Sequence, residues 1–95
     1  MILVRETFIA KPGMASKLAR LMRDAQREFA SGKVKVMTDL TGAFNKVVME
    51  TELESLAGLE KRMQEYGSNA KMKEKMSGYT DMYLAGEREI YQLLE

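Results

Sequence analysis

The sequence predicts one small α+β domain with the element order β-α-β-β-α-β over residues 1–95. Three observations predict this class. Segments rich in β-branched and apolar residues stand at both ends and in the middle of the chain. Two segments with apolar residues at helical spacing separate them. The composition, 45% hydrophobic and 31% charged, is typical of a globular protein.

The first predicted strand covers residues 2–10 (ILVRETFIA) and ends at the break formed by residues 11–13 (KPG). From Met14 onward the period changes to that of an amphipathic helix. Gly32 suits a left-handed cap at the end of this helix. The apolar stripe of the helix consists of Leu18, Leu21, Met22, Ala25 and Phe29.

An antiparallel hairpin is predicted next. Residues 33–41 (KVKVMTDLT) alternate with the period of a half-buried strand, whose apolar side would include Leu40. Residues 45–53 (NKVVMETEL) form the following strand, and residues 42–44 are the short turn between the two.

A second helical region begins after Ser55, which is a favourable N-cap residue. Residues 67–69 (GSN) interrupt the region, and residues 82–94 form the fourth strand. Gly86 within this strand predicts a bulge or a close backbone approach. The apolar stripes before and after the interruption consist of Leu56, Leu59, Met63 and Tyr66, and of Met72, Met76 and Tyr79.

Right-handed crossovers leave one simple arrangement for these elements, a ferredoxin-like four-stranded antiparallel sheet with the helices on one face. The strands nevertheless carry apolar residues at positions that point to both faces of the sheet, as in the run Val47-Val48-Met49. Both faces of the sheet therefore need cover, and we expect a second copy to pack against the bare face as a homodimer. Charged residues would line or rim the space between the two sheets, namely Arg5, Glu6, Glu50 and Arg88.

Four segments carry a resemblance to a known superfamily: VRETFIAKPG (4–13), DLTGAFNKVVME (39–50), ESLAG (54–58) and GEREIY (86–91). Together they resemble the dimeric α+β barrel superfamily, in particular its NIPSNAP-like branch, over nearly the whole chain. The resemblance implies a homodimer whose two sheets form a barrel with a cleft in each subunit. Relatives in the superfamily include cofactor-free quinone-forming monooxygenases, haem-degrading and haem-binding enzymes, and isomerases. NIPSNAP-like members often have no assigned activity.

Haem-degrading relatives use an Asn, a Trp and a His, and this chain has neither Trp nor His. Glu6 stands where the Asn of the first strand would fall, and Met49 and Thr51 stand where the NIPSNAP-like pattern tends to carry His and Trp. The chain also has no Cys. We therefore expect no haem, no transition metal and no other cofactor.

The ligand cleft is expected to involve Arg5, Glu6, Met49, Glu50 and Arg88 and to take a small apolar or aromatic molecule. Glu50 would be either a cleft acid or the partner of Arg5 or Arg88 in a structural ion pair, which is the commoner case. If there is a general base, Glu50 is the first candidate and Glu6 the second. Arg5 and Glu6 must face opposite ways, so only one of them can point into the cleft. Charge pairing with Glu50 would place Arg5 in the cleft. The positions matched by the family resemblance would instead place Glu6 there.

Charge and hydropathy exclude several classes of partner. The net charge is +1, without the basic excess that a nucleic-acid-binding protein shows. The first residues become charged too early for a signal peptide, and no apolar run approaches the ~20 residues that span a membrane. A cytoplasmic location is expected. The sequence does not decide whether the protein is an enzyme. Three classes stay open: a binding or structural dimer, a cofactor-free monooxygenase or isomerase, and a protein-interaction module.

Overall fold

The computed structural model describes residues 1–29 and 33–94, and its elements follow the predicted order. They are β1 (Ile2–Ala10), α1 (Ala15–Phe29), β2 (Val34–Thr38), β3 (Lys46–Leu53), α2 (Leu56–Ser68), α3 (Ala70–Lys75), the 3-10 helix η1 (Tyr79–Asp81) and β4 (Tyr83–Gln92). The Gly32 cap lies outside the described residues.

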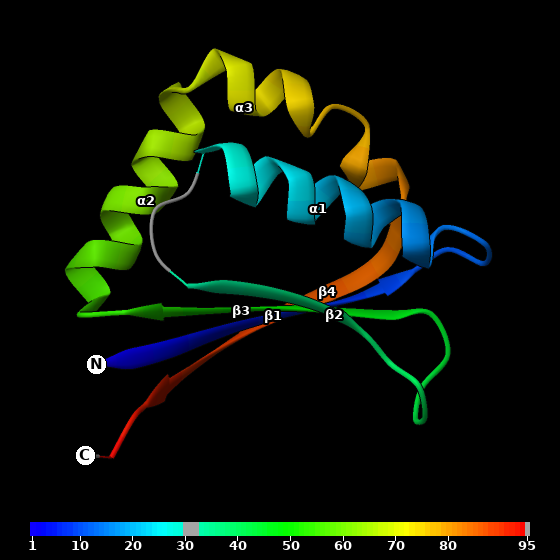
Figure 1. The fold of residues 1–95 in the computed structure, drawn as a ribbon, viewed down its shortest axis with the longest axis horizontal. Helices are drawn as coiled ribbons and strands as arrows, with labels where there is room; N and C mark the ends of the chain where they lie inside the picture. Colours follow the sequence, from blue (N-terminus) through cyan, green and yellow to red (C-terminus); the bar gives the residue numbers. More distant parts are fainter. Residues whose placement is uncertain (30–32, 95) are drawn as a thin grey trace.

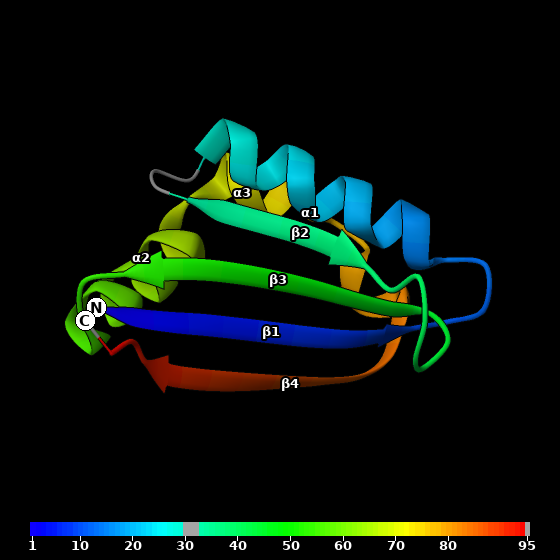
Figure 2. The same ribbon diagram turned by 60° about the horizontal axis from the view of Figure 1, so that its bottom comes forward.

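The four strands form one antiparallel sheet in the order β2-β3-β1-β4 (Figure 2). The helices lie over one face of this sheet, and no described element covers the other face (Figure 1). The predicted ferredoxin-like α+β fold is confirmed. The two ends of the chain lie side by side, where the Leu93 amide donates to the Met1 carbonyl at 3.1 Å. β1 is therefore a central strand, bonded to β3 on one side and β4 on the other.

The core lies between α1 and the sheet. Of the predicted stripe, Leu18, Met22 and Ala25 are buried, and the other two members are partly exposed. The side chains that meet them from the rest of the fold are Phe8, Ala10, Val47, Met76 and Met82.

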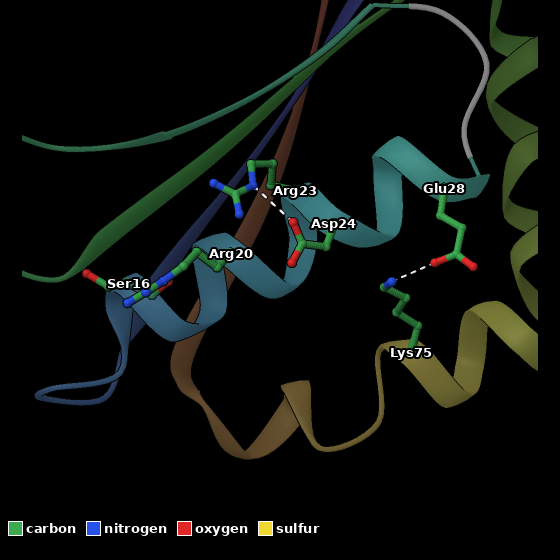
Figure 3. A network of polar contacts seen from close by, with 6 residues as sticks. All are labelled: Ser16, Arg20, Arg23, Asp24, Glu28 and Lys75. Atoms are coloured by element: carbon green, nitrogen blue, oxygen red, sulfur yellow. Dashed lines mark hydrogen bonds and ion pairs between the residues drawn. The ribbon is translucent and has the colours of Figure 1, made fainter.

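The outer face of α1 is polar. Arg23 pairs with Asp24 at 3.0 Å, and the Lys75 ammonium reaches Glu28 at 2.6 Å, which ties α3 to α1 (Figure 3). This contact is the principal cause that raises the pKa of Lys75 above its ordinary value.

The strand predicted over residues 33–41 is shorter than expected, and Leu40 is 99% exposed. The Lys46 amide donates to the Asp39 carboxylate at 3.0 Å, which starts a turn in place of further strand. Gly42 and Asn45 both have positive φ within this turn, 109° and 62°. Alternation along the sequence continues to Leu40, but the pairing of β2 with β3 ends at Thr38.

The helical region is interrupted as predicted, but the break is shorter than residues 67–69, because Gly67 and Ser68 belong to α2 and only Asn69 separates the two helices. Its backbone amide donates to the Glu65 carbonyl and ends α2, and its side chain accepts from the Met72 amide and begins α3. Ser55 caps α2 as predicted, accepting from the Gly58 amide at 3.3 Å. α3 ends at Lys75, so the expected third member of its stripe lies in η1 instead.

The Phe8 side chain packs closely against the backbone of Gly86. Of the two predicted roles of this glycine, the structure therefore shows the close approach. A Cβ built there would lie 3.2 Å from Cδ1 of Phe8. The bulge is nearby but elsewhere: the register shifts between Ile9 and Ala10, which makes Leu84 the extra residue of β4. Within the described residues, no helix has both the length and the apolar character needed to cross a bilayer.

Candidate functional site

Alternation along β1 separates the two faces of the sheet. Val4 and Phe8 are buried beneath the helices, so Glu6 between them has the same orientation. Arg5 points to the uncovered face. The structure thus places Glu6 on the helix side of the sheet and Arg5 on the opposite side, and which of the two faces a ligand stays a prediction.

The strand register places the other predicted site residues. Met49 and Arg88 stand opposite Glu6 on the two neighbouring strands, and Glu50 stands opposite Arg5. The structure therefore divides the five predicted residues between the two faces. Three of them lie on the helix side and two on the uncovered side, so they do not share one cleft or one inter-sheet space.

A cavity of about 320 Å³ lies between the sheet and the helices, and we call it the helix–sheet cavity. The three predicted residues on the helix side contribute to its lining. The helices and η1 supply further side chains of the lining, among them Gln26, Arg62, Tyr66, Met72 and Tyr79.

The cavity exists because α2 packs loosely against the sheet. α1 buries three side chains, whereas neither α2 nor α3 has a fully buried one. Leu59, Arg62, Met63 and Tyr66 recur at i, i+3, i+4 and i+7 and form the inner stripe of α2. Met63 on this stripe is still 49% exposed. An arginine among the inward residues marks the stripe as the wall of a cavity and not as core.

An ion pair crosses the floor of the cavity. Arg88 Nη2 lies 3.3 Å from Glu6 Oε2, and its Nη1 lies 3.9 Å from the Met63 sulfur. Burial raises the pKa of Tyr79, and the neighbouring Tyr66 hydroxyl adds to the rise. The Tyr79 phenol therefore stays protonated near neutral pH and can donate a hydrogen bond into the cavity.

Arg62 is a polar residue of the cavity whose hydrogen-bonding capacity is only partly used by the described residues. Its Nη2 donates to Gln26 Oε1 at 3.4 Å. Its Nη1 is buried and has no hydrogen-bond partner in residues 1–29 and 33–94. None of the ion pairs in residues 1–29 and 33–94 includes Arg62. Sequence reasoning missed this residue, although its position three after Leu59 on the apolar stripe was a usable signal.

The uncovered face has its own polar network. Arg5 Nε lies 2.7 Å from Glu50 Oε2, so Glu50 has one of its two expected partners. This hydrogen bond raises the pKa of Arg5 above its ordinary value. The Arg5 guanidinium also lies 5.3 Å from the centre of the Tyr91 ring, and the Tyr91 hydroxyl donates to Glu89. That second hydrogen bond raises the pKa of Tyr91.

In the part of the chain that the structure describes, no group of three or more His, Cys, Asp or Glu side chains is placed to hold a metal ion. The side chains of the helix–sheet cavity can instead supply two carboxylates, two guanidinium groups, phenol hydroxyls and flexible apolar walls.

Comparison of the sequence with protein-family models and with curated proteins finds no match. Comparison of the structure finds similar folds. A NIPSNAP family protein from Agrobacterium tumefaciens aligns with a TM-score of 0.86 at 12% identity over 99% of this chain and 93% of that one. An uncharacterized NIPSNAP domain protein from Burkholderia xenovorans aligns at 0.83 and 10% identity over 99% and 95%. An antibiotic biosynthesis monooxygenase aligns at 0.74 and 12% identity over the full length of both chains. The chain thus has the fold of NIPSNAP family proteins, as the sequence resemblance implied.

Proposed function

We propose that residues 1–95 form one domain that acts as a homodimeric small-molecule-binding protein, with the ligand in the helix–sheet cavity. The cavity carries this proposal. Its volume of about 320 Å³ lies at the lower end of the range of about 300–1,000 Å³ for ligand pockets. An apolar cavity of about 150 Å³ admits benzene, so roughly two fused rings fit here. Methionines 22, 49 and 72 in the lining suit apolar ligands of varied shape.

Calorimetric titration with 2-naphthamide and 2-naphthoate, two bicyclic probes of this size, tests the proposal. We expect one probe molecule to bind per chain. Met72→Trp fills the cavity from α3 and should abolish binding, whereas Leu40→Trp on the exposed turn should leave it unchanged. If the wild-type protein binds neither probe at millimolar concentration, the cavity does not serve as a binding site.

The uncovered face supports self-association. Leu3, Ile9 and Val48 on this face are only partly exposed, and Met37 on β2 is 38% exposed. These apolar side chains surround the Arg5 network. A second copy would remove them from water, and removal of apolar surface is the main driving force of association.

Charges on the same face are arranged so that they complement a copy of themselves. Lys35, Glu50, Arg5 and Glu89 are paired in register across all four strands, giving a row of alternating sign. A two-fold axis parallel to the strands sets this row against its own reverse, so that each cation faces a carboxylate. The proposed occupant of the face is therefore a second copy. Sedimentation at micromolar concentration should give twice the chain mass, and a folded monomer would contradict the proposal.

A second candidate function is that of a cofactor-free monooxygenase or isomerase. It is favoured by Glu6, a carboxylate that lies in the cavity with Tyr79, and by the fold shared with an antibiotic biosynthesis monooxygenase. Glu6 would act as a general base on a phenol. In the monooxygenase reaction, a phenol and O₂ give a quinone and water, and the substrate itself supplies the electrons.

Small quinols and lactones are suitable substrates to screen for this activity. If turnover is found, Glu6→Gln should lower it by about 10²–10⁴-fold, the usual loss for a general base. Glu60→Gln is the control, because Glu60 is exposed on α2 and is not among the residues that line the cavity. Equal turnover in Glu6→Gln and wild type would exclude the base mechanism. The cytoplasmic location expected from the sequence stays a prediction that cell fractionation can test.

A further inference from the structure

We propose that the helix–sheet cavity selects a small aromatic or apolar molecule that carries one carboxylate, and that Arg62 binds this carboxylate. The inference rests on the proposed function, because it requires that a small molecule occupies the cavity. It adds the charge of the ligand and the residue that recognises it.

The geometry of Arg62 is that of an incomplete binding site. A guanidinium holds five N–H donors in one plane, and its fork matches the two oxygens of a carboxylate. In Arg62 one donor of Nη2 is used by the Gln26 side chain at 3.4 Å. Arg62 lines the cavity, and its Nη1, which is closed off from solvent in the unliganded structure, has no hydrogen-bond partner among the described residues. Buried polar groups in folded proteins are nearly always bonded, so an unused charged donor in the wall of a cavity points to a partner from outside the chain.

The carboxylates of the described residues do not supply that partner. Glu6 is engaged by Arg88 at 3.3 Å. Glu65 also borders the cavity, but it is exposed to solvent and makes no ion pair with Arg62. The Glu6–Arg88 pair is neutral as a unit, so Arg62 is the cation of the cavity that no ion pair compensates. An acidic ligand would supply the missing charge.

The rest of the lining fits the body of such a ligand. The methionine side chains at positions 22, 49 and 72 offer apolar contact on three sides, from α1, β3 and α3. Tyr79 and Glu6 provide a hydrogen-bond donor and an acceptor for a polar substituent. The inferred ligand is thus an aromatic or apolar acid of about two rings.

The test compares two probes of the same shape, anionic 2-naphthoate and neutral 2-naphthamide, by calorimetric titration at pH 7. Wild-type protein should bind 2-naphthoate about tenfold or more tightly than 2-naphthamide, as hydrogen bonds to a charged group predict. Arg62→Gln should bind both probes equally, and Arg62→Lys should keep part of the preference. Arg20→Gln, an arginine on the outer face of α1 (Figure 3), should keep all of it.

Three results would overturn the inference, and they separate it from the proposed function. Equal affinity of the wild-type protein for both probes would refute the inference and leave the binding function intact. A preference that survives in Arg62→Gln, with its fold verified by circular dichroism, would refute the assignment to Arg62. A lack of binding of both probes would refute the inference and the binding function together.

Discussion

Replacement of Arg62 by methionine should make the unliganded protein more stable. Methionine keeps a flexible apolar stem and removes the guanidinium. The variant loses one long hydrogen bond of 3.4 Å to Gln26, worth about 0.5–1 kcal/mol. It also relieves the cost of a buried donor without a partner, about 1–3 kcal/mol. The balance is a gain of about 1 kcal/mol in the free energy of unfolding.

Thermal unfolding followed by circular dichroism measures this gain. For a domain of this size about 1 kcal/mol raises Tm by roughly 4–8 °C. The protein concentration must be the same for all variants, because the Tm of a dimer depends on it. Arg20→Met is the matched control, since Arg20 is exposed and its Nε bonds only the Ser16 carbonyl at 3.2 Å. A fall of several degrees in Arg62→Met, with Arg20→Met unchanged, would show that the guanidinium stabilises the empty fold and would refute the reasoning.

Three further predictions concern the uncovered face, the sheet and the cavity. Val48→Asp puts a charge into the proposed dimer interface and should weaken association by several kcal/mol, giving monomers in sedimentation; an unaltered dimer would contradict that interface. Gly86→Val crowds Phe8 from 3.2 Å and should cost about 1–3 kcal/mol in urea unfolding, whereas Gly67→Ala, with nothing within 4 Å, should gain about 0.5–1 kcal/mol. The opposite order would exclude close packing at Gly86. The raised pKa of Tyr79 favours the protonated folded state, so its contribution is complete below the ordinary value near 10 and is lost as pH rises through the folded value. Tyr79→Phe should therefore lose less stability than wild type in melts between about pH 9 and 12, and parallel curves would contradict the assignment.

Elements with a clear period could be predicted from the sequence, and their ends could not. The stripe of α1 predicted the burial of Leu18, Met22 and Ala25 because a helix repeats its neighbours regularly. Leu40 continued the alternation of β2, yet the Asp39 side chain ends the strand before it. The Asp39 carboxylate accepts a hydrogen bond from the backbone amide of Lys46, seven positions later. The alternation of apolar and polar residues cannot predict such a contact.

The candidate site was predictable to the extent that it depends on the parity of a strand. Because Arg5 and Glu6 are adjacent in a strand, their side chains must point to opposite faces of the sheet. The buried neighbours of Glu6 show that Glu6 is the one that faces the helices. Arg62 was missed for a different reason. A charged residue on a helix is exposed in most proteins, and its burial here depends on how far α2 lies from the sheet.

The two proposed roles of the fold meet in β1. This strand is central in the sheet, and its alternate residues serve opposite faces: Glu6 lines the cavity, and Arg5 joins the network of the uncovered face. Its neighbours on both sides pair with it in the same way, so β3 contributes Met49 to the cavity and Glu50 to the other face. A strand that packs beneath the helices and, in the proposed dimer, against a second copy is expected to be apolar on both faces. Because the side chains of both faces share one backbone, association at the uncovered face would restrict backbone motion in the floor of the cavity. Ligand affinity should therefore depend on the dimer even though no cavity residue lies in the interface.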